Sequence, residues 1–210
     1  DDGNENAATI TLANYLDLQN NYTTGVITAT FAVGGTGIDA IGEALNKTNG
    51  VYDIVSGNAL SMTLKDATVA AEDIITLAGR TSGLITFDDP AGGTGPGDAL
   101  TKITGSLDEL KSVFALKSAS APGVTGIGDA PLEIDTAGVL NAADLAALDA
   151  ATTGVIDATK AGISVSGLIA DVRSVLDAAD DSDANANSTI DFGNGNNEAT
   201  IDVTITDVTI

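Results

Sequence analysis

The sequence predicts an α/β protein made of three imperfect strand-helix-strand-helix repeats, stacked as a solenoid-like unit. Three observations favour this fold. A Thr-Thr-Gly or Thr-Ser-Gly tripeptide recurs three times, each copy follows a stretch with helical apolar spacing, and strands of alternating polarity separate the copies. Alternation of strands and helices predicts parallel pairing with the helices as crossovers. A mainly β sandwich is the alternative, because Thr and Val are abundant and favour strands.

The tripeptide is the first landmark of the repeat. It lies at residues 23–25, 81–83 and 152–154, and each copy follows a predicted helix. The clearest helix covers residues 141–151, where Leu145 and Leu148 share one face. We expect the glycine of each tripeptide to end its helix in the left-handed conformation, where a Cβ would be costly.

The second landmark is a glycine that precedes a second helix. It occurs at Gly37, Gly105 and Gly167, and Ser106 with Glu109 has the spacing of a capping box. In the second copy an acidic and glycine-rich insertion, residues 88–98, lengthens the link before this landmark. Because the insertion is rich in Gly and Pro, we expect it to be a loop.

The third landmark is a strand of alternating polarity. It is expected at residues 8–12, 59–64, 130–135 and 199–205. These landmarks divide the chain into repeat 1 (1–58), repeat 2 (59–129), repeat 3 (130–198) and a closing or assembly strand (199–210).

Composition narrows the function classes. Hydrophobic residues make up 43% of the chain, which is enough for a core. The 30 acidic and 8 basic residues give a net charge of -22. We therefore expect no nucleic-acid partner, and we expect cations to be the preferred binding partners of this surface. Neither Cys nor His occurs, which excludes disulfides, thiolate or imidazole catalysis and ordinary zinc sites. No apolar run could span a bilayer, so we expect no membrane insertion. Because thiolate and imidazole catalysis are excluded, we also expect no enzyme activity.

Two acidic segments are candidates for Ca²⁺ binding. In the first, oxygen-bearing side chains recur at every second position, as in loops that wrap Ca²⁺. Its candidate ligands are Asp181, Asp183, Asn185, Asn187 and Asp191. The second segment is the insertion, with candidate ligands Asp88, Asp89 and Asp98. The glycine of an EF-hand loop is missing, since Ala186 stands at its position, and a solvated polar loop is the alternative for both segments.

Residues 140–158 read LNAADLAALDAATTGVIDA. This stretch resembles tandem repeats of very large secreted or surface proteins of marine bacteria and cyanobacteria. The resemblance covers about a third of the chain in its strong form. It implies an extracellular surface-layer, matrix or adhesin context, sometimes beside calcium-binding repeats, and it implies no catalytic activity.

The first and last strands favour self-association. Residues 8–12 and 199–210 are rich in β-forming residues with alternating apolar positions, and exposed edges of this kind recruit further strands. Pairing of these strands within the chain's own sheets is the alternative. We expect an extracellular structural building block that assembles into a filament, surface layer or matrix, with Ca²⁺ as a candidate ligand. A calcium-dependent adhesin that binds polysaccharide is the alternative function.

Overall fold

The computed structural model describes residues 9–21, 27–31, 59–64, 66–87, 100–118, 120–160, 164–179, 189–193 and 201–207. Helices and strands alternate along these segments. In chain order they are β1 (Thr9–Ile10), α1 (Leu12–Asn21), β2 (Thr28–Phe31), β3 (Ala59–Leu64), β4 (Thr68–Ala70), α3 (Ala71–Ala78), β5 (Leu84–Phe87), β6 (Lys102–Gly105), α4 (Leu107–Ala115), β7 (Gly123–Thr125), β8 (Leu132–Ile134), β9 (Leu140–Asn141), α5 (Ala142–Ala151), β10 (Ile156–Asp157), β11 (Ser164–Gly167), α6 (Ile169–Ala179), β12 (Ile190–Asp191) and β13 (Asp202–Ile205).

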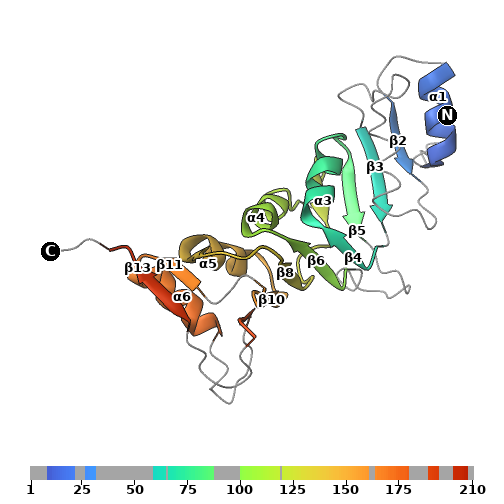
Figure 1. Ribbon diagram of the computed structural model, residues 1–210. Helices are drawn as coiled ribbons and strands as arrows, with labels where there is room; N and C mark the ends of the chain where they lie inside the picture. The colour runs from blue at the N-terminus through green and yellow to red at the C-terminus, as the bar shows by residue number, and fades with distance from the viewer. Residues whose placement is uncertain are drawn as a thin grey trace.

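The described strands form three sheets, and every pair in them is parallel. Sheet A has the order β1-β2-β3-β5-β7, sheet B the order β12-β10-β8-β6-β4, and sheet C the order β13-β11-β9. The predicted α/β class is therefore confirmed, and the β-sandwich alternative is wrong, because such sandwiches are built from antiparallel sheets. The molecule is elongated, with α1 and β13 at opposite ends (Figure 1).

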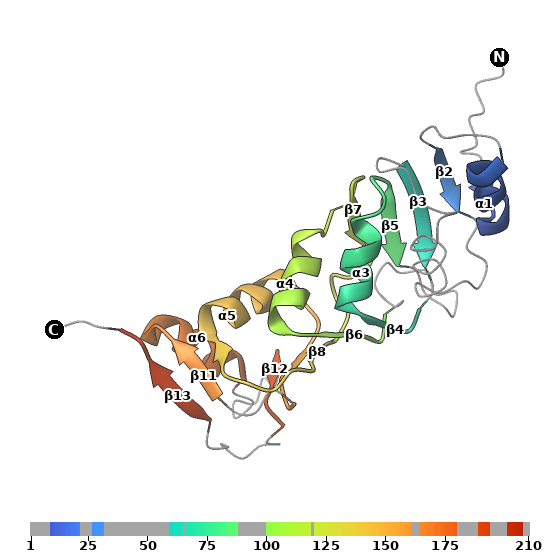
Figure 2. The same cartoon turned by 45° about the horizontal axis from the view of Figure 1, so that its top comes forward.

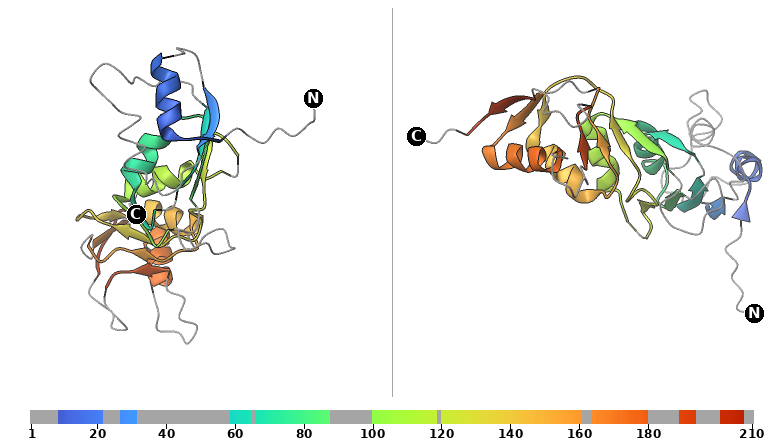
Figure 3. Two further views of the ribbon diagram at one scale, coloured as in Figure 1. Left: turned by 90° about the vertical axis from the view of Figure 1, so that its right-hand side faces the viewer. Right: turned by 90° about the horizontal axis from the view of Figure 1, so that it is seen from below.

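Helices α3, α4, α5 and α6 follow one another in a row beside the strands (Figure 2), and each contacts the next. Helices α5 and α6 lie on one side of the strands of sheet C (Figure 3, right, yellow and orange). Each of these helices begins directly after a strand or one residue beyond it, so short links fix the helix against its sheet.

A continuous row of aliphatic side chains forms the core of sheet B. These side chains lie in register on the five neighbouring strands and are at most 2% exposed. The row consists of Val69, Ile103, Leu132, Ile156 and Ile190. Full burial of one such side chain contributes about 1.5–3 kcal/mol, so this row is a main source of cohesion between successive strands.

Gly83 and Gly154, the glycines of the second and third tripeptides, correct one expectation. Neither has the positive φ of a left-handed helix end, and helix α5 ends at Thr152, which is extended. Glycine is required here because the chain passes very close to an earlier segment. A Cβ on Gly83 would lie 2.2 Å from the carbonyl group of Leu60, and one on Gly154 would lie 2.2 Å from the carbonyl oxygen of Ala130.

The first threonine of each of these two tripeptides ties the chain to that earlier segment. The Thr81 hydroxyl accepts the N–H of Leu60 and donates to the carbonyl of the same residue, both at 2.8 Å. It also accepts the N–H of Gly83 at 3.0 Å. The Thr152 hydroxyl donates to the carbonyl of Gly128 at 3.2 Å and accepts the N–H of Gly154 at 2.9 Å. In these two copies, the tripeptide thus forms hydrogen bonds to a segment more than twenty residues earlier in the chain.

The glycines of the second landmark are also positions of close packing. A Cβ on Gly105 would lie 2.9 Å from the Cβ of Ala71, and one on Gly167 would lie 2.9 Å from the Cβ of Ala142. Each glycine therefore lies against the first residue of the preceding helix, α3 for Gly105 and α5 for Gly167. Gly37 and the first tripeptide glycine, Gly25, lie outside the described residues.

A local signal placed the start of helix α4 correctly. The capping box is confirmed, since Ser106 accepts the N–H of Glu109 while the Glu109 carboxylate accepts the N–H of Ser106. Strand β3 has the predicted bounds. The first predicted strand, 8–12, is shorter than expected, because helix α1 already begins at Leu12. The Thr11 hydroxyl caps this helix start by accepting the N–H of Asn14.

Candidate functional site

Most of the predicted calcium ligands fall outside the described residues. These are Asp88, Asp89, Asp98, Asp181, Asp183, Asn185 and Asn187. The structure describes Asp191, which is exposed on β12 and whose carboxylate accepts the N–H of Gly193 at 2.6 Å. Within the described segments, no three acidic side chains converge into a group that could hold a metal ion.

Asp191 lies in an acidic row on the outer face of sheet B. It is in register with Asp157 on β10, which is in register with Glu133 on β8. Asp157 accepts the N–H of Thr159 at 2.9 Å, so it repeats the local turn made by Asp191. Neighbouring strands lie about 4.8 Å apart, and like charges at this spacing repel. The row therefore concentrates part of the chain's negative charge on one face.

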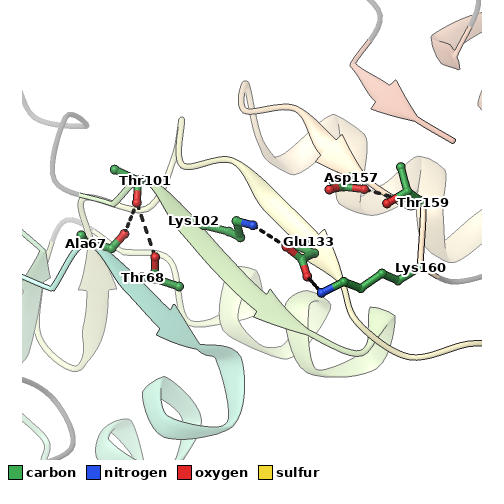
Figure 4. Close-up of polar contacts among 8 residues, drawn as sticks. All are labelled: Ala67, Thr68, Thr101, Lys102, Glu133, Asp157, Thr159 and Lys160. Carbon is green, nitrogen blue, oxygen red and sulfur yellow. Dashed lines mark hydrogen bonds and ion pairs between the residues drawn. The ribbon is translucent and has the colours of Figure 1, made fainter. Parts of the chain in front are cut away.

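Two lysines neutralise Glu133, the member of this row on β8. Glu133 is buried at 6% exposure, and its two carboxylate oxygens pair separately with Lys102 from β6 and Lys160 from the turn after β10 (Figure 4). The hydrogen bond from Lys102, and then that from Lys160, lowers the pKa of Glu133 against the opposing effect of burial. The bond to Glu133 in turn raises the pKa of Lys160.

These shifts define what the cluster can do chemically. A lysine nucleophile or base needs a lowered pKa, whereas the pKa of Lys160 is raised, so its amine stays protonated. Glu133 stays ionised, because its pKa is lowered, and cannot serve as a general acid near neutral pH. The cluster is an ion-pair link between β6, β8 and β10. This ion-pair cluster was not predicted from the sequence. The glutamate between Leu132 and Ile134, in the middle of a predicted strand, was the signal that could have indicated a buried, paired charge.

A small pocket lies between the end of α3 and the loop after α4. It has a volume of about 180 Å³ and is lined by residues that include Ala78, Ile85, Leu116 and Pro122. Lys117 also lines it, but its ammonium donates to the carbonyl of Ala151 at 2.9 Å. The pocket is below the range of roughly 300–1,000 Å³ that is usual for ligand sites.

The terminal strands β1 and β13 lie at sheet edges. The predicted assembly through edge strands depends on this position. Strand β1 is the last described strand of sheet A, and β13 is the last described strand of sheet C. Helix α1, which follows β1, and strand β13 lie at opposite ends of the molecule (Figure 1). Among the described residues, β1 and β13 each pair with another strand on one side only. On β13, Val203 and Ile205 remain 42% and 44% exposed. The described residues thus present two open edges.

Comparison with known proteins found no matching family model, no matching curated protein and no matching solved structure. In the described part of the chain, every helix falls short of the length and apolar character needed to cross a bilayer.

Proposed function

We propose that this chain is an extracellular structural building block, which self-associates into a filament, surface layer or matrix. One observation carries the proposal: β1 and β13 end their sheets at opposite ends of the molecule, each with one side unpaired in the described structure. Open edges of parallel sheets recruit further strands through their backbone N–H and C=O groups. A unit with such an edge at each end can extend indefinitely.

The division into three repeats (1–58, 59–129 and 130–198) and their solenoid-like stacking belong to the same proposal. Repeat architectures bury their core between neighbouring units and place unlike surfaces at the two ends. The matching roles of Thr81 with Gly83 and of Thr152 with Gly154 support this division. Under this proposal, repeats of neighbouring chains stack on one another in the same way as the repeats within one chain.

Calcium is the proposed ligand of the assembled form. A net charge of -22 opposes the approach of two copies, and divalent cations reduce this repulsion most effectively. Segment 181–191 and insertion 88–98 supply carboxylate and amide oxygens, the ligands that Ca²⁺ prefers. The extracellular location follows from the resemblance of residues 140–158 to surface-protein repeats, and Ca²⁺ is abundant there.

Electron microscopy of the purified chain tests the proposal, with millimolar calcium and again with a chelator. Ordered filaments or sheets are the expected result, and their loss in chelator would assign calcium the role of a linker. Monomers under both conditions would overturn self-association. A calcium-dependent glycan-binding assay would then test the adhesin alternative.

A further inference from the structure

We propose that copies of the chain associate head-to-tail, with the β1–α1 end of one copy bound to the β13 edge of another. This inference rests on the proposed self-association. It adds the polarity of the contact, its two surfaces and a role for helix α1. Four features of the described residues carry it: the backbone of β13, its side chains, the local order of β1 and α1, and the charge at the two ends.

The backbone of β13 offers unpaired groups on its outer side. The N–H of Thr206 donates to the carbonyl of Gly167 at 2.9 Å, and Ile205 is in register with Gly167. Successive residues of a parallel strand direct their backbone groups to opposite sides. Thr204 therefore faces β11 together with Thr206, whereas Val203 and Ile205 direct their N–H and C=O groups away from it. No described strand pairs with this side.

The side chains of β13 continue a core row that is left open at its end. Leu140, Val165 and Val203 lie in register on β9, β11 and β13. Their exposure is 5%, 0% and 42%. Helix α5 contacts β9 and β11, and helix α6 contacts β11 and β13. Ile205 is similarly exposed. A bound partner must therefore bring both a strand for the edge and a helix for these side chains.

The chain itself carries such a partner at its other end. Strand β1 leads almost directly into helix α1, as β9 leads into α5 and β11 into α6. On helix α1, Tyr15 is fully buried and Leu18 is 38% exposed. A second copy docked by this end would supply a parallel strand and a covering helix together. Two copies related by a two-fold axis would pair β13 antiparallel or with opposed faces, whereas β13 pairs with its described neighbour in parallel.

Charge opposes contact between these two described segments only weakly. Residues 9–21 carry one charged side chain, Asp17, although the whole chain has a net charge of -22. Residues 201–207 carry Asp202 and Asp207. The Asp207 carboxylate accepts the N–H of Ile169 at the start of α6, where the helix dipole stabilises a negative charge. Repulsion between residues 9–21 and residues 201–207 is therefore small for so acidic a chain.

Three single substitutions test the polarity by sedimentation velocity, under conditions in which the wild type assembles. Ile205→Glu places a charge in the β13 surface and Leu18→Glu places one in the α1 surface. Val139→Glu is the matched control, since Val139 is 61% exposed and lies between β8 and β9. We expect monomers for the first two variants and wild-type assembly for the third. An equimolar mixture of the first two should form dimers and stop there, because each variant keeps one intact end.

The outcomes separate this inference from the proposed function. Assembly of Ile205→Glu at the wild-type level would overturn the head-to-tail contact and leave self-association standing. Dimers of Leu18→Glu alone would show a tail-to-tail contact, and a wild type that never assembles would overturn the proposed function itself. Circular dichroism checks folding. If Ile205→Glu does not fold, Ile205→Thr serves instead and should raise the concentration for half-assembly about tenfold, and an unchanged concentration would overturn the contact.

Discussion

Single residues set the distance between neighbouring parts of this chain. Gly83 and Gly154 each lie where an added Cβ would meet backbone atoms at 2.2 Å, and backbone cannot move aside as a side-chain end can. We expect Gly154→Ala to lower the free energy of unfolding by about 3 kcal/mol, at the upper end of the cost of overpacking. Urea denaturation measures this change.

Gly79 provides the control for this prediction. It ends helix α3 with right-handed helical dihedral angles, and a Cβ there would make contacts no closer than 3.4 Å. Gly79→Ala should therefore change stability by less than about 1 kcal/mol. Equal losses for the two variants would contradict the close approach at Gly154.

At the scale of one helix, the start of α4 depends on the capping box. Ser106 accepts the N–H of Glu109, and the N–H and hydroxyl of Ser106 lower the pKa of the Glu109 carboxyl. We expect Ser106→Ala to cost about 1 kcal/mol of stability at neutral pH, as is usual for the loss of an N-cap. Thermal and urea unfolding both measure it.

Ser112 is the matched control on the same helix. It is exposed, and its hydroxyl donates to the carbonyl of Asp108 one turn earlier. Because this carbonyl already lies inside the helix, Ser112→Ala should leave stability unchanged or raise it slightly, since Ala favours helices. A loss as large as that of Ser106→Ala would argue against a special role for the cap.

The link between strands β6, β8 and β10 should depend on pH. Because the pKa of Glu133 is lowered in the folded chain, its contribution to stability is fully present above the ordinary glutamate pKa of about 4.3. It is lost as the pH falls through the lowered folded value. We therefore expect wild type to exceed Glu133→Gln in stability at pH 7, with the difference shrinking as the pH falls below about 4.

Thermal unfolding across this pH range gives the measurement. Asp129→Asn is the control, since Asp129 is exposed and forms no ion pair with Lys102 or Lys160 in the described structure. Its stability should follow that of the wild type at each pH. A Glu133→Gln difference that stays constant with pH would show that the side chain acts through packing instead of charge.

For the whole molecule, the net charge of -22 predicts a strong response to ions. Salt at 0.1 M shortens the reach of charge to about 10 Å, so sodium chloride alone should promote assembly to some extent. Calcium bound at defined sites should act at far lower ionic strength. We expect light scattering to rise more with calcium chloride than with sodium chloride at equal ionic strength, and equal responses would contradict specific calcium sites.

The fold was predictable where its signals are local. Alternating polarity defined strand β3, apolar spacing defined helix α5, and the Ser106–Glu109 spacing defined the start of α4, because each signal acts within a few residues. The recurring tripeptides were found, but the role expected of the glycines was wrong for Gly83 and Gly154. A left-handed helix end is a local explanation, whereas the real cause is the backbone of Leu60 or Ala130, more than twenty residues earlier.

The sequence by itself determined the α/β class, the absence of cysteine and histidine chemistry, and the acidic surface. These follow from composition and short-range periodicity. Only the tertiary structure decided how the described strands divide among three sheets, that Lys102 and Lys160 meet at Glu133, and which edges of these sheets stay open among the described residues. Strand pairing joins residues far apart in the chain, so it depends on packing of the whole core and leaves no signature in a short segment.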